Sequence, residues 1–324
     1  MTRIAWVLGV LGVLLLVGTL AGVAFGPVQL APKRLVMALF STGDQTAEVV
    51  VWTLRLPRVA AALLVGACLG VAGAMLQLST RNPLGDPQLF GIGGGAAIVQ
   101  ALALAGVVRL GPWGLMTLSV AASLAGAGII ALFASREDLG PSRLALIGVS
   151  VAALSVAVAT GIMAHARVFS QQSLAFIGGS MANRGWQDTL PALPFLAVGM
   201  VLALVVAGRL GLLVLGDQIA ANLGGDPRRT RLGAMAAAGV LGGAAVAVAG
   251  LVGFVGLLVP HLARALVGHD ARALVLVCIP LGAALTLYAD QVARLAFMPS
   301  EVPVGMITTI LGAPLMIYVA RRVA

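Results

Sequence analysis

The chain has 324 residues, of which 60% are hydrophobic and only 10% are charged. An ordinary soluble domain carries about 25% charged residues, so this much apolar surface excludes a single soluble core and indicates a lipid environment. The net charge of +9 comes from mostly scattered arginines, which excludes the basic stripe of a nucleic-acid-binding protein and is typical of membrane loops.

The one lysine of the chain, Lys33, stands between Pro32 and Arg34. A phosphate-binding P-loop needs a lysine followed by serine or threonine after a glycine run, so the sequence contains no such loop. We therefore expect no ATP hydrolysis and no bound cofactor in this chain. ATP and magnesium would belong to another subunit.

Nine charge-free windows are long enough to predict membrane-spanning helices, since a bilayer core needs roughly 20 apolar residues. The window 232–263 is too long for one span and contains Gly250, Gly253, Gly256 and Pro260, which we interpret as breaks that leave one full helix and one half-helix. Ten segments result, in an all-α polytopic membrane protein with a single domain over residues 1–324. The windows are 4–32, 59–80, 87–108, 110–135, 144–166, 189–208, 232–263, 273–289 and 302–320.

The first window resembles a signal peptide in opening with Arg3 and in having small residues near Ala21. Its apolar run is longer than the roughly 7–15 residues of a signal core, so we expect a retained helix. An even number of spans places both termini on one side. That side carries Arg3, the three arginines within 228–231 and the two arginines at 321–322. The positive-inside rule assigns the side with this excess of arginines to the cytoplasm.

Three arginines, Arg55, Arg58 and Arg294, are expected near the opposite, outer surface. Arg55 and Arg58 are three residues apart and would share a helix face. Guanidinium groups there suit carboxylates of a docking protein, and they equally suit plain interfacial snorkelling. The spacing alone leaves both interpretations open.

The cytoplasmic stretch 209–231 contains a short predicted helix, at about 216–224. Asp217 is expected as its N-cap and Gly224 or Gly225 as its stop, with Gln218, Ala221 and Leu223 between them. It is either a surface loop helix or a knob that inserts into a partner, and the residues do not decide between these.

Two cytoplasmic loops could close a passage through the membrane. One holds Asn82, Pro83 and Leu84, and the other, at 139–143, holds Pro141 and Ser142. On the outer side, residues 170–179 form an amphipathic segment that is too short to span and is expected as a lip helix. The three histidines, among them His261, lack paired ligand spacing, so no metal site is expected.

Two polar stretches interrupt the otherwise apolar chain. The first is 81–87, and the second is the run from Gly253 to Arg264. Helix breakers at such a depth need protein or water around them, because lipid cannot satisfy free backbone groups. This run and the first polar stretch, 81–87, also carry a resemblance to the FecCD family of membrane permeases. The motifs are Arg55-Leu56-Pro57-Arg58, Arg81-Asn82-Pro83-Leu84, Gly253-Phe254-Val255-Gly256, Pro260-His261, Arg264, Ala289-Asp290, Arg294, Glu301-Val302-Pro303 and Gly312-Ala313-Pro314.

The resemblance implies one permease subunit of a type II ABC importer in the bacterial inner membrane. A second permease subunit, expected as a homodimer or a close heterodimer, two ATPase subunits and one binding protein would complete the machine. It implies that Arg55, Arg58 and Arg294 face glutamates of the binding protein. The segment Asp217–Leu223 looks like the ATPase coupling helix, and the loops at 82–84 and 141–142 look like the cytoplasmic gate.

The cargo is expected to be a ferric siderophore, with haem or cobalamin as alternatives. The run Gly91-Ile92-Gly93-Gly94-Gly95 departs from the sequence common in relatives and does not name the cargo. An ion-coupled secondary transporter would place ionisable residues at the midplane, and an intramembrane enzyme would need a nucleophile or carboxylate pair there. Neither pattern is present in the charge-free windows.

Overall fold

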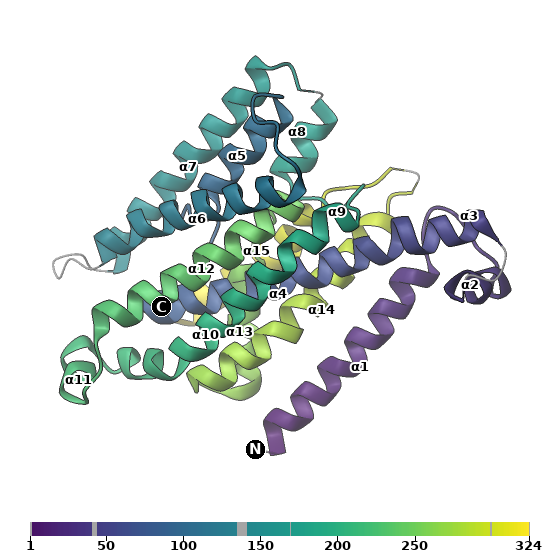
Figure 1. The fold of residues 1–324 in the computed structure, drawn as a ribbon. Coiled ribbons are helices and arrows are strands. Elements are labelled where there is room, and N and C mark those ends of the chain that lie inside the picture. The colour runs from purple at the N-terminus through teal and green to yellow at the C-terminus, as the bar shows by residue number, and fades with distance from the viewer. Residues whose placement is uncertain (1, 41–43, 135–140, 169, 299, 324) are drawn as a thin grey trace.

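A computed structural model describes residues 2–40, 44–134, 141–168, 170–298 and 300–323, and all regular elements among them are helical (Figure 1). Among these residues, seven helices are long and apolar enough to cross a membrane, and three apolar helices are shorter. These ten confirm the predicted all-helical membrane fold. The long ones are α1 (Thr2–Ala24), α4 (Leu56–Thr80), α6 (Pro112–Ala134), α7 (Pro141–His165), α10 (Leu193–Val214), α12 (Pro227–Ala249) and α14 (Ala271–Leu295), and the shorter ones are α5 (Gly94–Leu104), α13 (Val255–Val267) and α15 (Val304–Val323).

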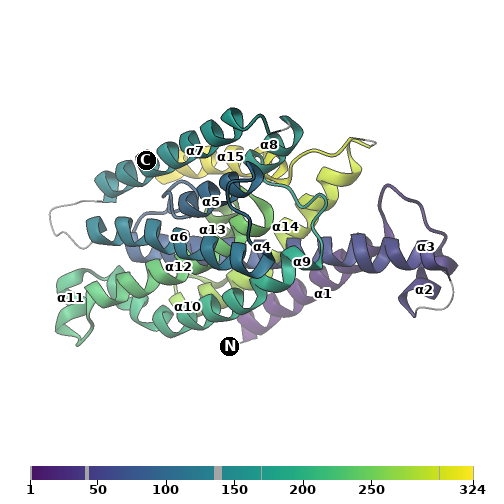
Figure 2. The same ribbon diagram turned by 45° about the horizontal axis from the view of Figure 1, so that its top comes forward.

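Short helices lie at both ends of the long ones. The predicted cytoplasmic helix is α11 (Asp217–Asn222), and α2 (Pro32–Leu39) and α3 (Gln45–Glu48) lie at the opposite end (Figures 1 and 2). The predicted lip helix is α8 (Ser170–Ile177). Three short elements remain. They are the π-helix η1 (Val49–Arg55), the α-helix α9 (Trp186–Thr189) and the 3₁₀ turn η2 (Leu190–Ala192).

The second span is longer than its charge-free window, because α3, η1 and α4 continue one another from Gln45 to Thr80. Asp44 caps the start of this helical run. It accepts hydrogen bonds from Arg34 Nε (2.5 Å) and from the Ala47 N–H (3.1 Å). These bonds lower the pKa of the Asp44 carboxyl. The cap ties α2 to the start of the second span.

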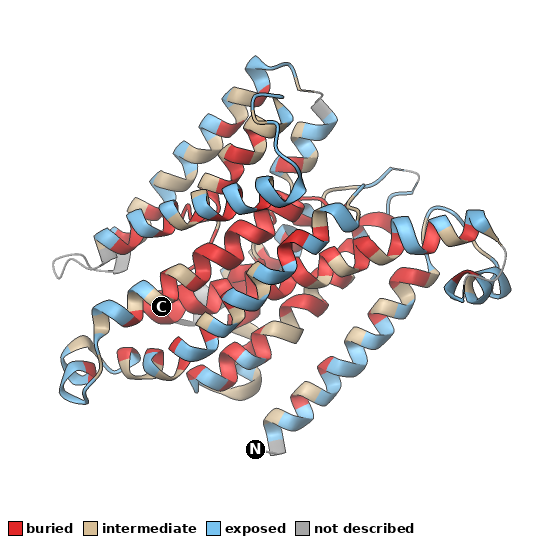
Figure 3. Ribbon diagram, in the orientation of Figure 1, coloured by how far each residue is buried: buried red, intermediate tan, exposed pale blue. Residues whose placement is uncertain are grey.

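Helices α4 and α12 form the centre of the molecule, and α1 and α7 lie at its periphery (Figure 3). The apolar windows of α4 and α12 are 89% and 83% buried, whereas those of α1 and α7 are 28% and 17% buried. A helix that is apolar all round and still exposed is stable only against lipid or another protein. The exposed surfaces of α1 and α7 are therefore available to the bilayer or to a partner subunit.

Small residues let the central helices approach closely, as the glycine spacing in the sequence suggests. A Cβ atom on Gly73 of α4 would lie 1.9 Å from the carbonyl oxygen of Gly256 in α13. A Cβ on Gly66 would lie 2.1 Å from the carbonyl oxygen of Gly282 in α14. No side chain fits at either place, so the contact of α4 with α13 and α14 depends on these glycines.

The long window 232–263 is divided as predicted into a full helix and a half-helix, but Gly256 and Pro260 are not among the breaks, because both lie within α13. Residues 250–254 separate α12 from α13, and α13 continues through Pro260. Proline lacks the N–H that would bond to the carbonyl four residues earlier, which is that of Gly256. Gln77 Nε2 donates to this carbonyl and to that of Leu257, both at 3.3 Å, so the missing bond is replaced from α4.

The α4–α13 contact gives a stability prediction. Gly73→Val should destabilise the protein by about 3 kcal/mol or more, because the added atoms have backbone rather than a movable side chain against them. Gly12→Val on the exposed face of α1, where nothing lies within 4 Å, is the matched control. Thermal unfolding in detergent measures both variants. Equal melting temperatures for the two would contradict this packing.

Candidate functional site

Arg55 closes the end of the first helix. Its Nη1 donates to the carbonyl oxygens of Val23 (2.6 Å) and Ala24 (2.8 Å), and its Nη2 donates to that of Val28. The last carbonyls of a helix have no partners within the helix and carry partial negative charge. Arg55, only 4% exposed, therefore holds the C-terminal end of α1 against α4.

Arg58 lies between two carboxylates of the same chain. Its Nε is 2.9 Å from Asp290 Oδ2, and its Nη1 is 2.8 Å from Glu301 Oε2. Arg58 and Asp290 are 9% and 3% exposed, so this is a largely buried ion pair. This pairing was not predicted from the sequence. The available signal was Asp290, which directly follows the apolar window 273–289. An acidic residue at such a place must face protein or water, so a partner within the chain could have been expected.

The third arginine, Arg294, is 3% exposed and donates from Nη2 to the carbonyl of Gly22 (3.1 Å). Its Nε is buried and has no hydrogen-bond partner among the described residues. Arg55, Arg58 and Arg294 line one pocket of about 420 Å³, together with Glu301. The structure thus brings the three predicted residues together, but most of their donors already have partners within the chain. The docking role stays a prediction.

Helix α11 differs in detail from its prediction. Its N-cap is Gly216, and Asp217 is the first helical residue. The Asp217 carboxylate is engaged elsewhere: it accepts from Arg81 Nη2 and from Arg231 Nη2, the latter at 2.8 Å. Ion pairing to two arginines replaces the cap because both guanidinium groups reach the carboxylate from neighbouring helix ends.

The exposed side of α11 is partly apolar. Ile219 and Leu223 are 49% and 60% exposed, and Gln218 and Ala221 are exposed beside them. Gly224 has a positive φ of 80° and follows the helix end, as predicted for a stop. Apolar side chains exposed at the end of a bundle, outside the spans, favour a protein partner over a plain loop.

The predicted gate loop after α4 is a tight turn. The Asn82 Oδ1 accepts from the Leu84 N–H (2.9 Å), and the Asn82 carbonyl accepts from the Gly85 N–H (3.0 Å). Asn82 is buried, whereas Pro83 and Leu84 are exposed. The other predicted loop, 139–143, is helical from Pro141 onward, since Pro141 and Ser142 begin α7. Their side chains, and residues 139–140, lie outside the described part of the chain.

The two polar interruptions of the sequence meet in space. A Cβ on Gly256 would lie 2.6 Å from Pro87 Cδ, so α13 begins directly against the first polar stretch. Asp86, 2% exposed, accepts hydrogen bonds from the N–H groups of Gln88 (2.8 Å) and Leu89 (3.2 Å). At the other end of the second stretch, Arg264 donates to Gln77 Oε1. These bonds supply the partners that non-helical backbone needs inside a membrane protein.

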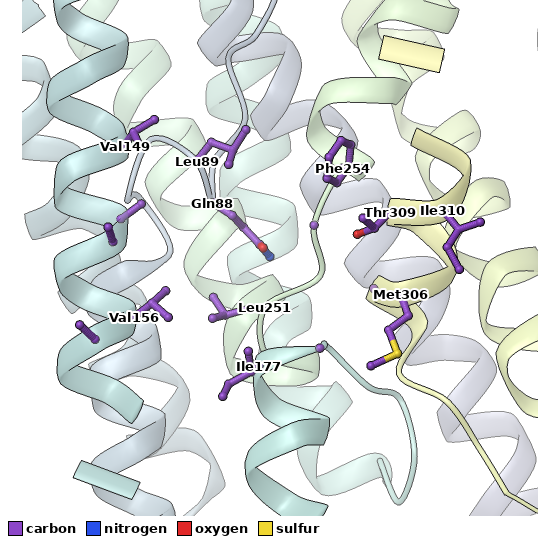
Figure 4. Close-up of a pocket in the computed structure, with 16 residues that line it drawn as sticks. Gln88, Leu89, Val149, Val156, Ile177, Leu251, Phe254, Met306, Thr309 and Ile310 are labelled. Carbon is purple, nitrogen blue, oxygen red and sulfur yellow. The ribbon is translucent and has the colours of Figure 1, made fainter. Parts of the chain in front are cut away.

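A cavity of about 910 Å³ opens beside this junction (Figure 4). It lies among α7, α15, the end of α8 and the non-helical residues before α13. Gln88 and Thr309 contribute the polar side chains of its lining, which is otherwise apolar. Phe254 also lines it, in a left-handed conformation with φ 67° that is rare for a bulky residue. Backbone held in such a conformation concentrates at functional sites.

The amide of Gln88 extends into this cavity in Figure 4, and its Nε2 has no hydrogen-bond partner among the described residues. His261 and the other members of the second stretch do not form a metal site: among the described residues, no group of three His, Cys, Asp or Glu side chains could hold a metal ion. The motif could be predicted from the sequence but the cavity could not, because no motif indicates that α7 and α15 face each other.

Known proteins match the chain over nearly its whole length. The FecCD transport family matches residues 14–322. The Fe(3+)-citrate import system permease protein YfmD of Bacillus subtilis is 37% identical over 284 residues, which cover 88% of this chain and 85% of that protein. The vitamin B12 import system permease protein BtuC of Vibrio cholerae is 38% identical over 296 residues, which cover 89% and 88%.

A solved structure is also similar. A metal-chelate type ABC transporter in an inward-facing conformation has a TM-score of 0.83 and 28% identity, with 98% of this chain and 99% of that chain covered. The fold of nearly the whole chain thus recurs in a transporter that shares 28% of the sequence. On this evidence the chain belongs to the FecCD transport family.

Proposed function

We propose that the chain is the permease subunit of an ATP-driven importer that carries a ferric siderophore or a similar ferric chelate. The observation that supports this cargo most directly is the cavity of about 910 Å³. Its described lining contains no Asp, Glu, His or Cys, so it offers a bare metal ion no anionic or imidazole ligand. An organic chelate that encloses the metal presents carbon and uncharged oxygen atoms, which suit an apolar wall.

Cobalamin is the second candidate cargo, because the chain is 38% identical to a vitamin B12 import permease. Both cargoes are bulky organic chelates, and the cavity volume does not separate them. Uptake of a radiolabelled ferric siderophore, ferric citrate and cobalamin by the reconstituted importer compares them directly. Preferential uptake of a ferric chelate is the expected result, and uptake of cobalamin alone would replace the proposed cargo.

The proposed assembly has two copies of this chain, two ATPase subunits and one binding protein in the inner membrane. The exposed apolar face of α7 supports pairing with a second copy, since the cavity beside α7 opens at the subunit surface. The exposed apolar residues of α11 support an ATPase contact on the cytoplasmic side. Both termini are proposed to lie on that same side, in agreement with the arginine distribution.

ATP should be hydrolysed only by the partner subunit. The purified chain alone is expected to show no ATPase activity above background, because its only lysine cannot form a P-loop. Co-purified ATPase subunits should restore hydrolysis, and their own catalytic-site variants should remove it again. A catalytic rate from the isolated chain would contradict the proposed division of labour.

Filling the cavity should block transport. Ala153→Trp places an indole in the cavity lining, so uptake is expected to fall at least about tenfold while ATP hydrolysis continues. Val198→Trp on an exposed face of α10 is the matched control and should transport normally. Uptake into proteoliposomes at equal protein measures both variants. Normal uptake by the Ala153 variant would remove the cavity from the pathway.

The arginine pocket gives a prediction with opposite signs for two variants. If Arg58 binds a carboxylate of the binding protein, Glu301 competes with that carboxylate. Glu301→Gln should therefore strengthen docking by about threefold to tenfold, whereas Arg58→Gln should weaken it by about tenfold or more. Surface plasmon resonance at low salt measures both affinities, and weaker docking by the Glu301 variant would contradict the competition.

The buried pair with Asp290 makes the choice of variant important. Arg58→Glu would place three carboxylates together, so its main effect would be on folding, where breaking a buried pair costs about 3–5 kcal/mol. The melting temperature of each variant is therefore measured beside its affinity. Arg34→Gln, which breaks an exposed ion pair of α2, is the control and should leave docking unchanged.

A further inference from the structure

Asp217, the first residue of α11, is held by two arginines that come from other helices. Arg81 Nη2 donates to its Oδ1, and Arg231 Nη2 lies 2.8 Å from both of its oxygens. The side chains of Arg81, Arg231 and Asp217 are 33%, 19% and 43% exposed, so the cluster is partly shielded from water. We call Arg81, Asp217 and Arg231 the Asp217 cluster.

Each arginine of the cluster also binds a helix end. Arg81 Nε donates to the carbonyl of Leu213 (2.5 Å), in the last turns of α10. Arg231 Nε donates to the carbonyl of Ser79 (3.3 Å), near the end of α4. Cations are favoured at helix C-termini, where carbonyl groups lack partners. The cluster therefore joins the ends of α4 and α10 and the start of α12 to the first residue of α11.

Arg81 is also the backbone link to the turn at 82–84. It ends α4 with φ 51° and ψ 33°, a left-handed conformation that is uncommon for a residue with a long side chain. Such a conformation is strained, and it persists only where the surrounding structure holds it. The bonds to Leu213 and Asp217 hold the Arg81 side chain, and the direction in which the chain enters Asn82 depends on that residue.

A second ion pair nearby shows what an ordinary surface pair looks like in this chain. Arg229 and Asp226 lie three residues apart, their side chains are 85% and 51% exposed, and the Asp226 carboxylate also caps α12. This pair joins residues of one segment. The Asp217 cluster instead joins Arg81 to Asp217, which are separated by 136 positions. A helix that served only as a surface loop would not need such a contact between distant segments.

We propose that the Asp217 cluster is the link through which movement of α11 reaches the turn at Asn82–Leu84, with Arg81 as the positioning residue. The inference rests on the proposed function, in which α11 contacts the ATPase and the turn closes the pathway. A displacement of α11 carries the Asp217 carboxylate, and the paired Arg81 guanidinium follows it. Because Arg81 is joined directly to Asn82, the turn then changes its direction.

The test uses the complete importer in proteoliposomes and three changes: Arg81→Gln, Asp217→Asn and the two together. Asp217→Asn is nearly isosteric, so it is informative even if the Arg81 variant folds poorly. Arg229→Gln is the matched control on the exposed pair. Two quantities are measured: ATP hydrolysed per cargo molecule transported, and the nucleotide-dependent change in mobility of a spin label at position 84, which is exposed.

Each single variant is expected to assemble with the ATPase, to hydrolyse ATP, and to need about fivefold to tenfold more ATP per transported cargo. The label should lose its response to nucleotide. The double variant should be no worse than the more affected single one, because both changes remove one interaction. The Arg229 variant should behave as the unaltered protein in both measurements.

The inference is overturned if the variants keep normal coupling and a normal label response, or if the Arg229 control fails equally. Loss of ATPase co-purification from Asp217→Asn would also overturn it, since the residue would then serve docking. Failure of the unaltered chain to assemble with any ATPase or to transport is a different result, which refutes the proposed function itself. A fall in melting temperature with normal coupling would assign the cluster a structural role only.

Discussion

Lipid offers no hydrogen bonds to a broken helix, and this constraint explains the centre of the molecule. The chain interrupts its helices after Thr80 and between Ala249 and Val255, and each interruption leaves backbone groups that the protein itself must satisfy. Gln77 donates to two carbonyls of α13 and accepts from Arg264, so one amide side chain replaces the bond that Pro260 removes. The cavity exists because irregular backbone is stabilised beside it.

The charged residues within the fold serve mainly as internal connections. Arg55 holds the end of α1, Arg58 is paired with Asp290, and Arg294 binds a carbonyl of α1. A buried guanidinium without a partner would be costly, so a residue of this kind is available to a docking protein only when an internal partner is exchanged. Glu301, more exposed than Asp290, is the partner suited to such an exchange. Docking would therefore act on the loop that precedes α15, and α15 lines the cavity.

The same principle applies at the end of the molecule that holds α11, where the arrangement is less buried. Asp217 gathers two arginines whose remaining donors bind the ends of α4 and α10. Ion pairs at partly exposed sites contribute little stability individually. Their value here lies in geometry, because they tie a short helix with an exposed apolar face to a turn that contains the buried Asn82. A few weak, directional contacts can thus couple two sites without making the structure rigid.

The class of protein and its apolar segments follow from the amino-acid sequence without any tertiary contact. Hydropathy sets where a helix can meet lipid, so the ten apolar segments and the break near residue 250 could be predicted without tertiary information. The motifs around Arg58, Asn82 and Gly253 marked the places of interest. Tertiary structure decided which groups meet: Arg58 with Asp290 across 232 positions, Asp217 with Arg81 across 136, and α7 with α15 around the cavity. Spacing along one helix predicts neighbours on that helix only, so contacts between distant segments, and the continuation of α13 through Pro260 by a bond from Gln77, could be seen only in the folded chain.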